Sequence, residues 1–179
     1  MPLATPTRRM PAAEAVREFL SELLAKTVEA AKVDELDLEQ HGDAVVSSVL
    51  IDDTDAPAGL ILSDLAFAAH AGASLIMLPA ATALDAVEAG ELTETLRENY
   101  HEVANIMTGL LNGPSVAHVR IGEHADGLSS DARDVVMKAA GRRTYDVSIP
   151  GYGDGRIALY AVGERAVDRP ADDGDESTP

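Results

Sequence analysis

The chain has 179 residues and a mass of 18.8 kDa, which suits one domain large enough to bury its own hydrophobic core. Its 31 acidic and 14 basic residues give a net charge of −17, so nucleic acids and anionic membrane surfaces would repel it and are not expected partners. Cysteine is absent, which excludes disulfides, thiol catalysis and cysteine–zinc sites.

The N-terminal third contains one clear amphipathic pattern. Residues 1–10 hold prolines and arginines and are predicted to be loose, without the apolar stretch of a secretory signal, so a cytoplasmic location is expected. Apolar residues recur at helical spacing over 11–32, which predicts the first helix. An acidic connector over 33–42 follows.

Two strands and a helix are predicted next. The β-branched and apolar residues of 44–51 predict a strand. An aspartate-rich turn follows, and residues 58–63 are predicted to form the strand that pairs with it. Asp64 can cap an alanine-rich helix over 65–78. Pro79 ends or redirects that helix.

The second half alternates helices and strands. A long helix is predicted over 91–111, followed by a strand over 115–121. Ser129 caps a short helix that reaches Ala140 and closes at Gly141. The remaining segments are a strand over 143–149, a hairpin turn over 150–155, a strand over 156–162 and an acidic tail over 164–179, predicted to be disordered.

Strands joined by hairpins pair antiparallel, so this order favours an α+β fold over a doubly wound parallel sheet. The elements suggest tandem helix–strand–strand–helix halves around a mostly antiparallel sheet, with long helices packed on it. Residues 11–163 are expected to form the single domain.

The helix over 91–111 carries two stripes about 140° apart on a helical wheel. The first is apolar and should face the core; it consists of Leu92, Leu96, Tyr100, Val103, Met107 and Leu110. The second consists of Glu98, Glu102, Asn105 and Gly109, which should project away from the core. On composition alone, this second stripe would be interpreted as a solvent-exposed helix face.

Glu102-Val-Ala-Asn105, with Gly109 four residues later, resembles the E-x-x-N signature of the CheC/CheX/FliY family of chemotaxis phosphatases. The position four before Glu102 is Glu98, where the family prefers Asp or Ser. A single motif on a mid-chain helix is most similar to CheX. The first helix lacks a second motif, because Glu22 is followed three residues later by Ala25.

The resemblance implies the CheC-like fold and a function. Such a protein would accelerate hydrolysis of the aspartyl phosphate of a CheY-type response regulator, with Mg²⁺ held by the regulator and no cofactor or metal bound by this chain. Asn105 would orient the attacking water, and Glu102 would pair with the regulator's active-site lysine. Glu98 and Gly109 would serve docking. The resemblance also suggests a homodimer formed by sheet-edge pairing.

Two departures leave an alternative open. Glu98 replaces the preferred Asp or Ser, and Leu128 stands where the family favours a proline, with Pro150 as the nearest counterpart. The alternative is a non-catalytic module of the same fold that docks to a response regulator or a flagellar-switch-like assembly. A third interpretation is that the chain is an acidic α+β domain unrelated to this family.

Other residue patterns in the sequence give weaker indications of a functional site. His101-Glu102-x-x-Asn105 lacks the second imidazole of a zinc-protease helix. The aspartates at 52–55 lack the pattern of a calcium loop and indicate a turn. The glycines at 151–155 lack the helix and lysine of a phosphate loop and indicate a hairpin.

Overall fold

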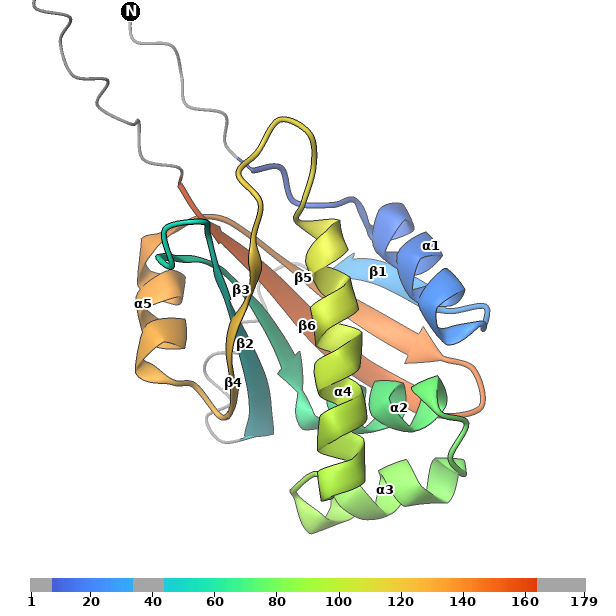
Figure 1. Ribbon diagram of the computed structural model, residues 1–179. Coiled ribbons are helices and arrows are strands. Elements are labelled where there is room, and N and C mark those ends of the chain that lie inside the picture. Colours follow the sequence, from blue (N-terminus) through green and yellow to red (C-terminus); the bar gives the residue numbers. More distant parts are fainter. Residues whose placement is uncertain (1–7, 34–43, 164–179) are drawn as a thin grey trace, which may run out of the picture.

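A six-stranded sheet forms the centre of the residues that the computed structural model describes, 8–33 and 44–163 (Figure 1). Each pair of neighbouring strands is antiparallel, in the order β1-β5-β6-β3-β2-β4. The strands are β1 (Glu29–Val33), β2 (Val45–Ile51), β3 (Pro57–Asp64), β4 (Arg120–Asp126), β5 (Ala139–Ile149) and β6 (Gly153–Val162). This arrangement confirms the predicted α+β class.

Helices lie on both faces of the sheet (Figure 1). On one face α2 packs against β6 and α4 packs across α2, while α1 covers β1; α5 packs on the opposite face over β2, β3 and β6. The helices are α1 (Ala13–Leu24), α2 (Leu65–Leu75), α3 (Ala80–Ala89), α4 (Glu94–Met107) and α5 (Ser130–Lys138), with a 3₁₀ turn η2 (Thr108–Leu110) after α4.

The strands separate the apolar residues into two cores, because successive side chains point to opposite faces. In β6, Ile157 and Leu159 join the larger core under α1, α2 and α4, whereas Ala158 and Tyr160 join the smaller core under α5.

The crossing of α2 and α4 depends on Gly72. A Cβ added at Gly72 would lie 2.7 Å from the carbonyl oxygen of Leu96, so the two backbones approach more closely than any side chain permits. Tyr100 lies fully buried one turn further along α4, with its ring edge-on to Phe67. This packing fixes which face of α4 is left to solvent.

Several predicted elements are confirmed. β2 and β3 match the predicted strands, and Asp64 caps α2 by accepting a hydrogen bond from the Phe67 N–H at 2.8 Å. Ser129 caps α5 in the same way, through the Ala132 N–H at 3.1 Å. β5 and β6 form the predicted final hairpin, although both strands are longer than expected and the turn is correspondingly shorter.

The prediction of one helix over 11–32 is wrong beyond Leu24. Ala25 adopts the left-handed conformation (φ 51°), and its N–H bonds back to the carbonyl of Glu22. The Ser21 hydroxyl then accepts the Val28 N–H at 3.0 Å and turns the chain into β1, which pairs with β5. Pairing with a distant strand overrides the helical propensity of Glu-Ala-Ala-Lys.

Three further boundaries differ from prediction. Residues 80–89 form α3, to which no element was assigned, and this helix ends at Gly90 in the left-handed conformation. The strand predicted over 115–121 lies at 120–126 instead. Its predicted start is a loop in which the Asn112 side chain bonds both backbone groups of Val119 and so replaces a strand partner. The chain enters β5 directly at Ala139, so Gly141 does not close a helix.

Parts of three predicted segments lie outside the described residues, namely 1–7 of the N-terminal segment, 34–42 of the connector and the whole tail 164–179. Among the described residues, no helix has both the length and the apolar character needed to cross a bilayer.

Candidate functional site

Glu98, Glu102, Asn105 and Gly109 all lie on the solvent-facing side of α4 and η2. We call these four residues the ridge. The opposite side of α4 is fully buried through the apolar stripe of Leu96, Tyr100, Val103 and Met107. The 3.6-residue period and burial of this stripe therefore place two carboxylates and one carboxamide in a single outward row.

The functional groups of the ridge have no partner among the described residues. The carboxylates of Glu98 and Glu102 accept no hydrogen bond and form no ion pair within 8–33 and 44–163, and the Asn105 carboxamide is likewise unbonded there. By contrast, Asn99 on the same helix donates its amide to the Thr95 carbonyl at 2.8 Å. The ridge side chains are therefore available to a ligand.

The space beside Gly109 is partly used within the protein itself. A Cβ at Gly109 would lie 3.3 Å from Cε2 of Phe19 on α1, so the missing side chain admits the Phe19 ring. The docking role of Gly109 stays a prediction. The structure adds a packing role, because Gly109 allows α1 and η2 to come into contact.

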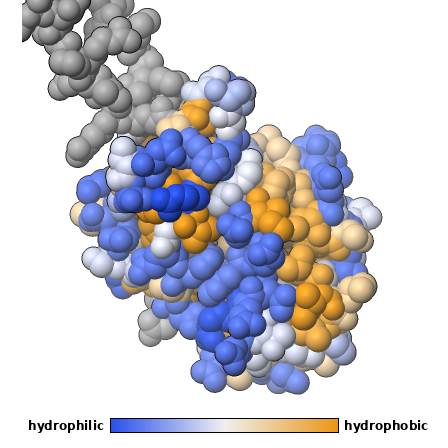
Figure 2. All heavy atoms as spheres, in the orientation of Figure 1, coloured by the Kyte–Doolittle hydropathy of each residue, from blue (hydrophilic) through white to orange (hydrophobic). Residues whose placement is uncertain are grey.

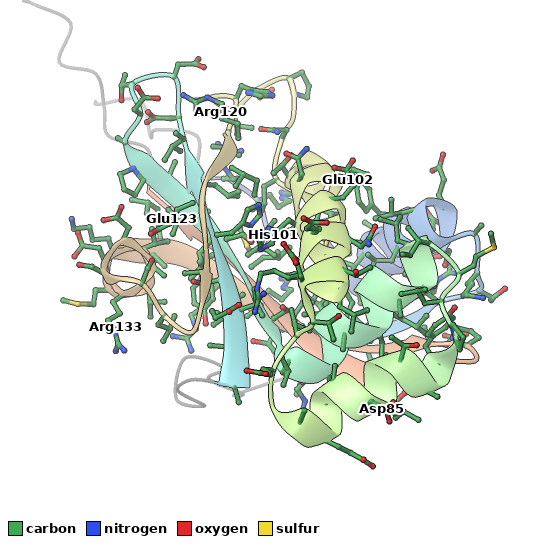
Figure 3. All side chains as sticks on the ribbon, turned by 60° about the horizontal axis from the view of Figure 1, so that its bottom comes forward. Asp85, His101, Glu102, Arg120, Glu123 and Arg133 are labelled. Atoms are coloured by element: carbon green, nitrogen blue, oxygen red, sulfur yellow. The ribbon has the colours of Figure 1, made fainter. Side chains whose placement is uncertain are left out.

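One flank of the ridge, toward β4, is polar. The rings of His101 on α4 and His124 on β4 stack in parallel, with centroids 3.8 Å apart and an interplanar angle of 3°. Nδ1 of His124 lies 2.8 Å from the Ser48 hydroxyl of β2, and Arg97 forms an ion pair with Asp126 at 2.9 Å. Figure 3 shows His101 turned toward β4 and Glu102 turned away from it.

Burial of this stack disfavours imidazolium. Burial lowers the pKa of His124 to about 4, with a further lowering by the neighbouring His101. The pKa of His101 is lowered by burial and then by Arg97, while Asp126 and Glu98 oppose the shift. Both rings are therefore neutral at pH 7. Sequence spacing gave no signal for this pair, because the two residues lie on separate elements.

A buried arginine fixes the chain just beyond the ridge. Arg8, which is 6% exposed, donates to the carbonyl of Leu111 and, at 2.6 Å, to that of Ala117. These two hydrogen bonds link the N-terminal segment to the loop that follows η2, at Leu111 and at Ala117. Pro11 adds a second tie, because its carbonyl accepts the Tyr145 hydroxyl at 2.5 Å.

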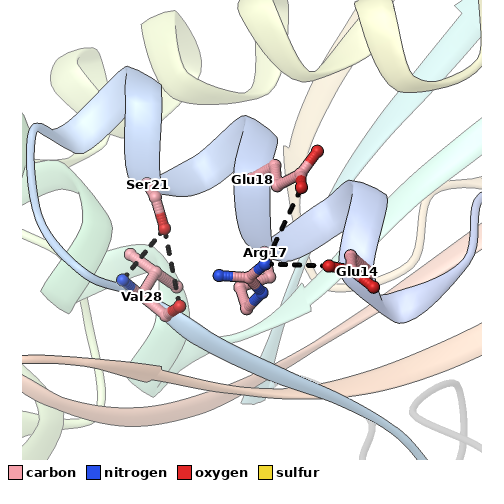
Figure 4. Close-up of polar contacts among 5 residues, drawn as sticks. All are labelled: Glu14, Arg17, Glu18, Ser21 and Val28. Atoms are coloured by element: carbon pink, nitrogen blue, oxygen red, sulfur yellow. Dashed lines mark hydrogen bonds and ion pairs between the residues drawn. The ribbon is translucent and has the colours of Figure 1, made fainter.

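Polar contacts on α1 stay local and do not reach the ridge. Arg17 pairs with Glu14 and Glu18, and Ser21 bonds Val28 (Figure 4). Pro150, the nearest counterpart of the family's proline, lies on the β5–β6 hairpin. That hairpin contacts the segment between α2 and α3 through a hydrogen bond from the Tyr152 hydroxyl to the Leu78 carbonyl.

The ridge lies on the exposed side of α4 and η2. A hollow of about 560 Å³ is lined by residues of β1, β5 and β6 together with Asp64, and by no ridge residue. The described residues contain no group of three or more histidine, aspartate or glutamate side chains arranged to hold a metal ion. The Asp52 carboxylate instead accepts hydrogen bonds from the N–H and hydroxyl groups of Thr54 within its own turn. The bond from the Thr54 hydroxyl is the main cause that lowers the pKa of Asp52. An exposed row on one helix, with unbonded carboxylate and carboxamide groups, suits a protein partner better than a small molecule.

No family model matches the sequence, and no curated protein matches it. Among solved structures, FliM in the FliM–SpeE complex from H. pylori aligns with a TM-score of 0.60 and 12% identity, over 84% of this chain and 81% of that chain. FliY from Thermotoga maritima aligns with a TM-score of 0.50 and 12% identity, over 84% and 89% of the two chains. A CheX–CheY–BeF₃–Mg²⁺ complex from Borrelia burgdorferi aligns with a TM-score of 0.48 and 16% identity, over 87% of this chain and 100% of that chain.

The first two alignments show that the chain has the fold of FliM and FliY. They confirm the resemblance to the CheC/CheX/FliY family at the level of the fold.

Proposed function

We propose that this protein docks onto a CheY-type response regulator through the ridge and accelerates hydrolysis of its aspartyl phosphate in chemotaxis signalling. The observation that carries the proposal is the row of Glu98, Glu102 and Asn105, exposed and unbonded among the described residues, on α4 of a CheC-like fold. The E-x-x-N motif supports this partner, and the fold agrees with the family that the motif resembles.

The chemistry required is positioning rather than covalent catalysis. Water attacks the phosphorus atom, the bond from phosphorus to the aspartyl oxygen breaks, and the products are inorganic phosphate and the free carboxylate. The Asn105 carboxamide can accept a hydrogen bond from the attacking water and donate one to a phosphoryl oxygen. The regulator's own acidic residues would hold the Mg²⁺ ion that neutralises phosphoryl charge.

Glu102 has a different role in this proposal. A carboxylate beside the phosphoryl group would repel it, so Glu102 is best placed against the regulator's lysine, where it fixes the register of docking. Glu98, one turn earlier on the ridge, adds a second docking carboxylate.

The experiment follows phosphate release from a regulator phosphorylated with acetyl phosphate, with and without this protein. Asn105→Ala should lower kcat about 100-fold, the size of effect seen when one positioned hydrogen-bonding group is removed. Glu102→Gln should mainly raise KM. Asn99→Ala, which removes the bonded carboxamide on the same helix, is the matched control and should change neither. Equal rates for wild type and Asn105→Ala would refute a catalytic role.

A second candidate is a docking module without catalysis. In the FliM–SpeE complex, FliM, which has the same fold, binds another protein. This candidate predicts tight binding of the regulator with no acceleration of phosphate release.

A further inference from the structure

Charge is unevenly distributed over the described residues. The helical face, formed by α1 and residues 65–111, carries nine acidic side chains and two arginines. Both arginines are already in ion pairs, Arg17 with Glu14 and Arg97 with Asp126. Lys26, just beyond α1, lies over the ring of Tyr152 at 5.2 Å. The field over the ridge is therefore negative and extends well beyond Glu98 and Glu102.

Apolar side chains lie beside the ridge on the same face. Ile106, next to Asn105, is 39% exposed, and Leu110 and Phe19 are half-buried where α1 meets η2. Ile76 and Met77, just after α2, are 42% and 84% exposed. We call these five residues the apolar band. Figure 2 shows apolar surface to the right of α4 that continues toward the corner between α2 and α3.

Packing within the chain does not account for the exposed end of this band. Met77 has a φ of 56°, a left-handed conformation that costs a non-glycine residue about 1 kcal/mol. It nevertheless holds a large apolar side chain in solvent. Such a residue gains by contact with another molecule, and contiguous exposed apolar surface rimmed by polar groups is typical of a protein interface.

We infer that the ridge, the apolar band and the surrounding acids form one docking face for a protein surface that is apolar at its centre and carries lysine and arginine at its rim. The inference rests on the proposed function, so the partner is the response regulator. The acids on α1 and α3 then select a regulator with a basic rim around its phosphorylation site. Apolar contact supplies affinity, whereas the rim charges supply association rate and selectivity.

The test measures binding of a CheY-type receiver domain loaded with beryllofluoride and Mg²⁺, by calorimetry for Kd and stopped flow for the association rate. Ile106→Ser should weaken Kd about tenfold, the loss expected at an interface residue that contributes about 1.4 kcal/mol. Met137→Ser is the matched control, because Met137 is 82% exposed on α5, on the opposite face of the sheet.

The rim is tested by a double variant, Glu22→Gln with Asp85→Asn, which removes one exposed acid from α1 and one from α3 (Figure 3 labels Asp85). It should slow association several-fold and flatten its dependence on salt. Asp131→Asn on α5 is the control for this pair and should leave both unchanged.

The outcomes separate this inference from the proposed function. If Ile106→Ser and the double variant leave Kd and salt dependence unchanged, the docking face is wrong, even where phosphate release depends on Asn105. If both variants weaken binding while wild type releases no phosphate, the docking face stands and the hydrolysis proposal fails. If the loaded receiver domain does not bind, the docking face is refuted.

Discussion

The stacked histidines between α4 and β4 make stability depend on pH. His124 has a pKa of about 4 in the folded protein against 6.5 in the unfolded chain. Between these values the unfolded state binds more protons, so stability is fully present above pH 6.5 and is lost as pH falls toward 4. At pH 5 the loss relative to pH 7.5 is about 1–2 kcal/mol for this residue, allowing for its partial exposure to solvent.

His124→Asn isolates this contribution. The amide keeps a partner for the Ser48 hydroxyl but has no proton to gain in this range, so unfolding stability should lose about 1–2 kcal/mol less between pH 7.5 and pH 5 than wild type does. Urea denaturation at both pH values measures the difference. His118→Asn, which replaces an exposed histidine, is the control and should follow wild type.

The reasoning is refuted by either of two results. One is a His124 imidazole that titrates near pH 6.5 when followed by NMR. The other is an equal loss of stability in wild type and His124→Asn. Acidification should also loosen the contact between α4 and β4, since two imidazolium rings at this separation would repel each other.

Two further predictions concern the packing that positions the ridge. Gly72→Ala should destabilise the fold by about 2–3 kcal/mol, because the new Cβ would clash with the Leu96 carbonyl oxygen. Gly113→Ala is the control and should be nearly neutral, because a Cβ there lies 3.9 Å from its nearest neighbour. Thermal melts compare the stabilities of the two variants. Asp64→Ala should cost about 1–2 kcal/mol, since it removes the acceptor for the Phe67 and Arg156 N–H groups, and Asp64→Asn should recover most of this in urea titrations. Equal stabilities within either pair would contradict the packing described.

Local patterns predicted the elements that local physics determines. The outward row of α4 follows from a strong 3.6-residue period, and Asp64 and Ser129 act as caps because their side chains bond N–H groups three residues on. The face of α4 that carries the candidate site could therefore be predicted before its neighbours were known.

Elements that depend on distant partners were missed. β1 has a helical sequence and is a strand only because it pairs with β5, and Ala25 turns the chain without the usual glycine. The stack of His101 on His124 and the bonds of Arg8 join residues with no sequence relationship. The position of Phe19 against Gly109 likewise required the three-dimensional packing of α1.

The most direct test of the central claim is the single-turnover loss of aspartyl phosphate from a CheY-type regulator in the presence of this protein. Wild type should accelerate the loss, and Asn105→Ala should return it close to the regulator's own rate while still binding the beryllofluoride form. Acceleration that survives Asn105→Ala, or a wild type that binds the regulator and does not accelerate the loss, would contradict the proposed role of the ridge.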